Sequence, residues 1–318
     1  MRFALMIEPQ QGLTYREQLA VARRAESLGF EAFFRSDHYE SFPGGSGEPT
    51  TDAWAVLAGL ARETGTIRLG ALMTPVLFRT PGNLAKLAAT VDEMAGGRLE
   101  VGVGAGWHEH EHAAHGFPFP PMQERADRLE ETLQILHGLW DGPDGWSFEG
   151  KHYTVKDALF RPKPGSLPER AGGRPNLITG GEGTPRGYRI AARHSDEFNL
   201  SSSTPEEAAA KFAALDEACS SIGRDPGTLT RSVMAGVLVG RDRAEVQARE
   251  QALLTALGAD GNSEAWLAKR RPRWVHGTPD EAREAAKRFE DAGAERLMLQ
   301  DFLPRDLAMI DAMAEALF

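Results

Sequence analysis

Asp37 and His38 stand side by side, directly after a short apolar run near the start of the sequence. A histidine in such a position can hydrogen-bond a ring carbonyl or transfer a proton, and an adjacent carboxylate can bias its charge. The alternative interpretation is structural, with Asp37 capping a short helix and His38 packing beside it. The pair is therefore a candidate catalytic site whose role depends on where the fold places it.

The histidine-rich run from His108 to His112 spells H-E-x-x-H. On a helix, His108 and His112 would share a face and could hold zinc in a hydrolase. However, the run follows a Gly-Ala-Gly strand exit, and no third ligand is spaced as in known metalloproteases. The sequence therefore also permits a solvated polar loop, or a site wall to which Trp107 and His108 contribute as candidate catalytic residues.

A glycine-rich turn, Gly180-Gly181-Glu182-Gly183, joins a predicted strand to a predicted helix. Glycines let backbone N–H groups approach a ligand closely, and a helix amino end adds partial positive charge, so a phosphate fits there. Glu182 works against anion binding unless its side chain points away. A tight turn without any ligand is the other interpretation.

Aromatic residues gather in segments that follow predicted strands, namely Tyr39, Phe42, Trp107, Phe117 and Phe119. Any one of them could pack in the core, which is the commoner fate of an aromatic side chain. Their shared placement in loops favours the wall of a substrate or cofactor site. We expect Tyr39, Phe42 and Phe117 to contact the substrate.

These candidates follow short apolar runs that alternate with longer helical stretches along the whole chain. Eight strands, each followed by helix, predict a parallel α/β sheet, and at 318 residues a closed (β/α)8 TIM barrel is favoured over an open sheet. No G-x-G-x-x-G opens the first unit, so a dinucleotide-binding fold loses its main support. The predicted strands cover residues 3–7, 32–35, 67–73, 99–103, 176–179, the region around 198, 232–239 and 296–299. In such a barrel the candidates lie at the carboxyl ends of the strands, where active sites form.

The composition narrows the possible partners and the compartment. The net charge is -10, so we expect no nucleic-acid partner, and no run is long and apolar enough to predict a membrane partner. A single cysteine, Cys219, excludes an internal disulfide and a thiolate-rich metal site, and a reducing cytoplasm is the default. We expect one domain over residues 1–318, with insertions near 141–175 and 258–276.

Four segments carry a resemblance to a known family. They are residues 35–38 (Arg-Ser-Asp-His), 70–75 (Gly-Ala-Leu-Met-Thr-Pro), 90–98 (Thr-Val-Asp-Glu-Met-Ala-Gly-Gly-Arg) and 102–107 (Gly-Val-Gly-Ala-Gly-Trp). The chain resembles the luciferase-like monooxygenase superfamily and, more narrowly, its actinobacterial branch of coenzyme F420-dependent oxidoreductases. The resemblance covers nearly the whole chain. It implies a (β/α)8 barrel, usually a homodimer, with the flavin lying across the carboxyl ends of the strands.

The resemblance also implies roles for particular residues. A non-proline cis peptide behind the ring would fall at Ala71-Leu72, His38 would stand near the reactive edge of the ring, and the turn from Gly180 would take the phosphate. Relatives tend to carry basic residues where this chain has Glu182 and Thr184, and asparagine where it has His108. The residues that would line the cofactor ring are Ala71, Leu72, Met73 and Thr74, with Trp107 nearby.

Four functions follow from these observations and the resemblance. The first is an oxidoreductase that moves a hydride between reduced coenzyme F420 and an unidentified small organic substrate. The second is a two-component monooxygenase of the same fold that uses reduced FMN and oxygen. A zinc hydrolase built on His108 and His112 and a non-enzymatic flavin-binding protein are the more distant alternatives.

Overall fold

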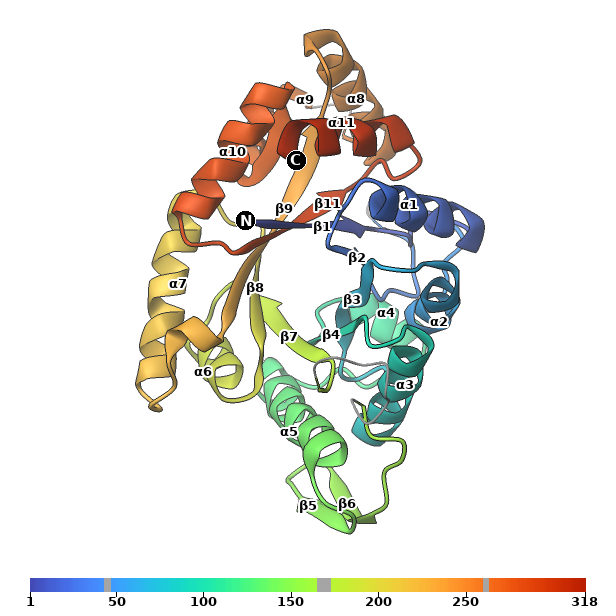
Figure 1. Cartoon of the computed structure of the whole chain (residues 1–318), viewed down its shortest axis with the longest axis vertical. Coiled ribbons are helices and arrows are strands. Elements are labelled where there is room, and N and C mark those ends of the chain that lie inside the picture. Colours follow the sequence, from blue (N-terminus) through green and yellow to red (C-terminus); the bar gives the residue numbers. More distant parts are fainter. Residues whose placement is uncertain (43–46, 165–172, 260–262) are drawn as a thin grey trace.

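The computed structural model describes residues 1–42, 47–164, 173–259 and 263–318. Its main sheet has nine strands in the order β10-β9-β11-β1-β2-β3-β4-β7-β8, and β8 also pairs with β9. This second pairing closes a ring of eight parallel strands, as Figure 1 shows. The closed barrel predicted from the sequence is therefore confirmed. The ring strands are β1 (Arg2–Ile7), β2 (Ala32–Arg35), β3 (Arg68–Pro75), β4 (Leu99–Gly104), β7 (Asn176–Gly181), β8 (Glu197–Ser201), β9 (Thr230–Val239) and β11 (Arg296–Asp301).

Helices surround the ring and connect its strands. Three of them begin after a threonine, because Thr14, Thr204 and Thr278 each form a capping box with a glutamate three residues later. No helix in the described residues is both long and apolar enough to cross a membrane. The helices are α1 (Tyr15–Ser27), α2 (Ala53–Glu63), α3 (Pro81–Met94), α4 (Glu109–Ala114), α5 (Met122–Asp141), α6 (Pro185–His194), α7 (Pro205–Ser220), α8 (Arg243–Ala256), α9 (Ser263–Arg270), α10 (Pro279–Asp291) and α11 (Leu307–Leu317).

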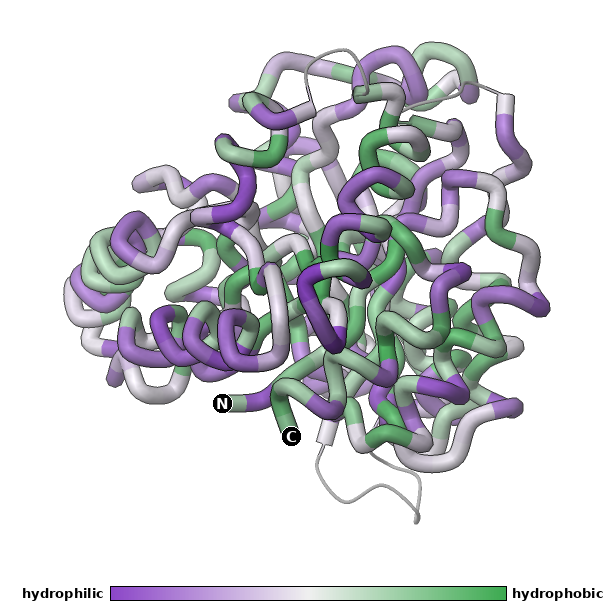
Figure 2. Tube along the Cα trace, turned by 90° about the horizontal axis from the view of Figure 1, so that it is seen from above, coloured by the Kyte–Doolittle hydropathy of each residue, from purple (hydrophilic) through white to green (hydrophobic). Residues whose placement is uncertain are grey.

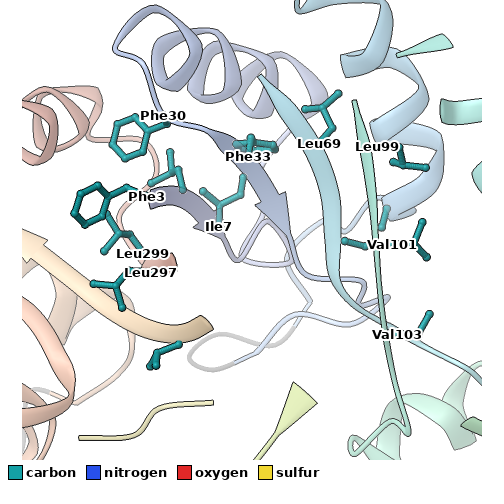
Figure 3. Close-up of a cluster of buried hydrophobic side chains, with 14 of the residues drawn as sticks. Phe3, Ile7, Phe30, Phe33, Leu69, Leu99, Val101, Val103, Leu297 and Leu299 are labelled. Atoms are coloured by element: carbon teal, nitrogen blue, oxygen red, sulfur yellow. The ribbon is translucent and has the colours of Figure 1, made fainter. Parts of the chain in front are cut away.

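Two apolar clusters hold the barrel together. The larger one fills the space between the ring and its helices, where outward side chains such as Phe33, Leu69 and Val101 are fully buried (Figure 3). The smaller one fills the inside of the ring with Met6, Phe34 and other apolar side chains. Figure 2 shows that hydrophilic residues concentrate on the outer helices and loops. The ring is thus a packed scaffold that presents its strand ends at two faces.

The amino ends of the strands, which we call the floor, carry a buried charge cluster. Arg296 is fully buried and donates hydrogen bonds of 2.7 and 2.9 Å to the carboxylate of Glu100 and one of 2.9 Å to Glu197. Arg68 also pairs with Glu100. Burial raises the pKa of Glu197, against the opposing charge of Arg296. For Glu100 the nearby guanidinium groups outweigh burial and lower the pKa to about 2.

The two predicted insertions contain more regular structure than the sequence indicated. Within 141–175, β5 (Trp146–Glu149) and β6 (Thr154–Ala158) form an antiparallel hairpin, and residues 165–172 lie outside the described part. Within 258–276, α9 leads through a 3-10 turn to β10 (Trp274–Gly277), which pairs with the second half of β9. A Cβ on Gly236 of β9 would come within 2.3 Å of the Trp274 indole, so the close approach of β10 needs glycine there.

The cis peptide lies one residue later than the resemblance implied. It joins Leu72 to Met73, and the expected position at Ala71-Leu72 is wrong. The pairing of β3 with β4 is irregular at this place, because Ala71 pairs with Val101 and the register resumes only at Thr74 opposite Val103. One extra residue on β3 is therefore accommodated at this irregularity, and the cis bond lies within it.

Candidate functional site

The carboxyl ends of the strands, which we call the mouth, bring together His38, which follows β2, and Trp107 and His108, which follow β4. The short helix α4 follows His108 directly, and its first turn is capped by the His108 ring, which accepts a hydrogen bond of 3.1 Å from the Glu111 N–H. The predicted catalytic histidines therefore do come together. Their ring centroids lie 6.4 Å apart.

His38 is held by a carboxylate that sequence reasoning did not single out. Its Nδ1 lies 2.9 Å from Oε2 of Glu111, whose side chain is fully buried. The other oxygen of Glu111 accepts hydrogen bonds from the backbone N–H groups of Tyr39 and Glu40. Burial alone would raise the pKa of Glu111, but the hydrogen bond and charge of His38 and these two N–H groups lower it below its ordinary value. Glu111 is therefore an ionised acceptor.

Asp37 does not partner His38, although the sequence suggested it. It is fully buried, and its Oδ2 accepts hydrogen bonds of 2.9 Å from Thr74 and 2.7 Å from Arg79. Burial raises the pKa of Asp37, and the charge of Arg79 opposes this shift. Asp37 and His38 follow the end of β2, and although they are adjacent in sequence their side chains have different partners. Asp37 supports the site from behind.

Arg79 gathers a second group of residues behind the mouth. Besides Asp37 it donates to Asp52 and to the hydroxyl of Tyr39, which itself donates to Asp52 over 2.7 Å. The Tyr39 ring lies 5.9 Å from Phe117 and 5.1 Å from Phe78. Tyr39 and Phe117, two predicted substrate residues, therefore belong to a packed aromatic cluster.

Phe42 and Trp107 form the wall beside His38. Their ring centroids lie 4.6 and 5.9 Å from the His38 ring, and Phe42 also stacks on His108 at 4.5 Å. The Trp107 side chain is 63% exposed, although large apolar residues normally avoid water. A flat ligand covering this wall would remove that surface from solvent.

The H-E-x-x-H run does not present a pair of metal-binding histidines. His108 Nδ1 accepts the Glu111 N–H, whereas His112 is fully buried and its Nδ1 lies 2.9 Å from the His108 carbonyl oxygen. The His112 ring instead packs against Phe78 and Phe119. Over the described ranges, no three His, Cys, Asp or Glu side chains gather where they could hold a metal ion.

Behind the mouth, the residues predicted to line the cofactor ring divide into two groups. Ala71 and Thr74 are fully buried, and Thr74 both accepts from the Trp54 indole and donates to Asp37. Leu72 and Met73 instead belong to the cluster inside the ring. A Cβ on Gly180 would come within 2.4 Å of Met73 Cε, so the methionine side chain extends across to β7. Met73 thus forms the apolar base of the mouth beside the glycine turn.

The turn Gly180–Gly183 has a cation beside it that the sequence pattern did not reveal. Lys211 of α7 donates a hydrogen bond of 3.0 Å to Ser203, and its Cδ lies 3.3 Å from the place a Cβ on Gly183 would occupy. Gly183 has a φ of +85° and Gly181 a φ of +148° with open space in front, whereas Glu182 is exposed. Arg186, by contrast, pairs with Asp127 of α5. The turn with Lys211 fits a phosphate group.

Asp301, the last residue of β11, is a buried acid at the mouth. Its Oδ1 accepts a hydrogen bond of 2.7 Å from the Leu303 N–H, whereas Oδ2 has no partner among the described residues. Burial raises the pKa of Asp301 to about 7. This carboxyl group is therefore costly to ionise in the folded protein.

Comparisons with known proteins find relatives that match most of the chain. The F420-dependent glucose-6-phosphate dehydrogenase of Intrasporangium calvum is 28% identical over 308 residues, covering 89% of this chain and 88% of the relative. Pyrimidine monooxygenase RutA of Enterobacter sp. strain 638 is 27% identical over 267 residues, covering 81% and 69% of the two chains.

Solved structures share the same architecture. An F420-dependent secondary alcohol dehydrogenase in complex with an F420-acetone adduct superposes with a TM-score of 0.80 at 21% identity over 98% of both chains. Monooxygenase RslO1 from Streptomyces bottropensis gives 0.81 at 23% identity over 100% of this chain and 98% of its own. At these identities the likeness shows the fold.

The family follows from a sequence model. The model described as luciferase-like monooxygenase matches residues 1–309, and the resemblance carried by the four sequence segments is thereby confirmed. The similar proteins named above are oxidoreductases and monooxygenases. This chain belongs to the luciferase-like monooxygenase family of enzymes.

Proposed function

We propose that this enzyme transfers a hydride between coenzyme F420 and a small organic substrate. The observation that carries the proposal is the presence, at one end of the barrel, of a proton-transfer group and an anion-binding turn. His38 provides the first, and the turn Gly180–Gly183 with Lys211 provides the second. The similarity to an F420-dependent dehydrogenase over 89% of the chain supports this choice of cofactor.

The residues of the mouth have distinct tasks in this proposal. When bound, the deazaflavin supplies a carbon that gives or accepts a hydride without activating oxygen. Lys211 and the glycine turn bind the phosphate, and Met73 supports the ring from the barrel interior. Phe42 and Trp107 cover the reacting atoms and exclude water. His38 exchanges a proton with the substrate while Glu111 keeps its ring in place.

A monooxygenase that uses reduced FMN is the second candidate. Similar proteins include pyrimidine monooxygenase RutA and monooxygenase RslO1, which favours this alternative on the same fold. The two cofactors compete for one site, so their relative affinity separates the candidates. Location in the cytoplasm and assembly into a homodimer stay predictions.

Fluorescence titration of the purified protein with F420 and with FMN tests the proposal. We expect F420 to bind at least tenfold more tightly, and Lys211→Met to weaken its binding about tenfold, as losing about 1.4 kcal/mol from a charge-assisted contact would.

Lys151→Met is the matched control, because Lys151 is 70% exposed on the β5–β6 hairpin and pairs with Asp127. Tighter binding of FMN would favour the monooxygenase instead. An unchanged F420 affinity in Lys211→Met would remove Lys211 from the cofactor site.

A further inference from the structure

Glu111 contacts both histidines of the mouth through different atoms. Its carboxylate lies 2.9 Å from His38 Nδ1, and its backbone N–H donates to His108 Nδ1 over 3.1 Å. The same residue is therefore an acceptor for one imidazole and a donor for the other. Because the hydrogen bond at one ring nitrogen decides where the proton of a neutral imidazole resides, these contacts determine both tautomers.

For His38 the proton must lie on Nδ1. The lowered pKa of Glu111 keeps its carboxylate ionised, and an ionised carboxylate only accepts hydrogen bonds. The Nε2 atom of His38 has no hydrogen-bond partner among residues that the structure describes, and it does not belong to the buried unpaired atoms. In the neutral ring, Nε2 is thus a free acceptor.

For His108 the assignment is the reverse. A ring nitrogen that accepts the Glu111 N–H carries no proton, so the proton of neutral His108 lies on Nε2. The backbone N–H is present whatever side chain occupies position 111. The tautomer of His108 is therefore independent of the carboxylate, whereas that of His38 depends on it.

We propose that Glu111 is a positioning residue that sets His38 and His108 in opposite tautomers. The mouth then offers a basic Nε2 on His38 and an Nε2–H donor on His108, with ring centroids 6.4 Å apart. This arrangement suits a substrate that interconverts a hydroxyl and a carbonyl group, since one partner must accept a proton and the other must stabilise an oxygen.

The step that this arrangement supports rests on the proposed function. With an alcohol as substrate, His38 Nε2 would take the O–H proton, and a bound, oxidised deazaflavin would supply the acceptor for the C–H hydride. The alcohol would leave as a carbonyl compound, and His38 would then pass its proton to solvent. The tautomers themselves are properties of the protein alone and can be measured without cofactor or substrate.

Glu111→Gln is expected to reverse the tautomer of His38. Oε1 of Glu111 accepts two backbone N–H groups, from Tyr39 and Glu40, so the amide oxygen of glutamine takes that place. Its NH2 group then faces His38 Nδ1, and that nitrogen must become the acceptor. The proton of His38 moves to Nε2, the wrong atom for a base.

The experiment is ¹⁵N NMR of the histidine rings in the purified protein at about pH 8.5, well above the ordinary imidazole pKa near 6.5. His38→Phe and His108→Phe assign the two ring signals. We expect the wild type to carry the proton on His38 Nδ1 and His108 Nε2. Glu111→Gln should reverse the major form of His38 only, and Glu109→Gln, an exposed carboxylate of the same helix, should change neither.

A wild-type His38 with its proton on Nε2, or a Glu111→Gln protein that keeps it on Nδ1, would overturn the proposal. If Glu111→Gln does not fold, the wild-type signal still decides, and Glu111→Asp should retain the wild-type form. F420 titration of wild type and Glu111→Gln separates the proposed function from this inference. The NMR result decides the tautomer proposal even if neither protein binds F420.

Discussion

The two ends of the same barrel treat charge differently. At the floor, Arg296, Glu100 and Glu197 are buried and pair chiefly with one another. At the mouth, Glu111 is equally buried but contacts a histidine whose Nε2 has no hydrogen-bond partner among the described residues, and Trp107 is exposed to water. The charges of the floor are paired with one another inside the fold, whereas the mouth presents groups that a ligand could contact. This division matches the general behaviour of (β/α)8 enzymes.

The largest effect on stability is expected when the central cation of the floor is removed. Arg296→Met leaves Glu197 without its guanidinium partner and weakens the pairing of Glu100. We therefore expect the free energy of unfolding to fall by about 3–5 kcal/mol. Urea denaturation measures the change. The exposed pair Arg243–Glu281 supplies the control, because Arg243→Met should cost about 1 kcal/mol or less. A loss below 1 kcal/mol in Arg296→Met would show that the floor does not depend on its charges.

At the mouth, replacing a buried acid should raise the free energy of unfolding, which is the opposite of the effect expected at the floor. The folded-state pKa of Asp301 is raised to about 7, so its stabilising contribution is complete below about pH 4 and lost as the pH rises through 7. Asparagine imitates the protonated acid and does not ionise. We expect the free energy of unfolding of Asp301→Asn, relative to that of the wild type, to rise by about 2 kcal/mol from pH 5 to pH 8.

Urea denaturation at the two pH values checks this difference. Asp280→Asn is the control, since that side chain is 96% exposed and should show no such dependence. Equal pH dependence in Asp301→Asn and the wild type would mean that this carboxyl group ionises freely, and the contrast between mouth and floor would lose one of its supports.

The smallest expected effect on stability concerns the exposed wall. Trp107→Ala should change the free energy of unfolding by no more than about 0.5 kcal/mol, because little of the side chain is buried. It should weaken F420 binding roughly fivefold, as the loss of about 1 kcal/mol of aromatic contact would.

The matched control is Ile222→Ala, an exposed apolar residue after the end of α7 that should affect neither quantity. A large loss of stability in Trp107→Ala would show that the tryptophan belongs to the fold instead of the ligand site.

The sequence predicted the scaffold well because the alternation of short apolar runs with helical stretches is a local property of the chain. The strand at residues 32–35 has the predicted bounds, and the predicted strand at 3–7 differs from β1 by one residue. The hairpin of β5 and β6 escaped prediction, since its strands are short and lie in a stretch rich in glycine and proline. β10 was missed because it has only four residues and depends on pairing with β9.

The site was predicted less completely because its partners come from distant segments. His38 and Glu111 are 73 residues apart, and the histidine run drew attention to His108 and His112 instead of the glutamate between them. Lys211 likewise reaches the glycine turn from the following helix of the barrel. The sequence paired His38 with its neighbour Asp37, but that carboxylate accepts hydrogen bonds from Thr74 and Arg79 instead.

The contact between Gly236 and Trp274 has a consequence for how this barrel can be altered. Strand β9 pairs with its ring neighbour β11 as far as Val237 and with β10 from Gly236 to Val239, so β10 is attached to the ring through the last residues of β9. Segments of other lengths could replace the chain between α8 and Trp274 without changing the ring, provided that residue 236 beside the indole stays a glycine. A larger residue at position 236 would clash with the Trp274 indole and so displace β9, which is part of the ring.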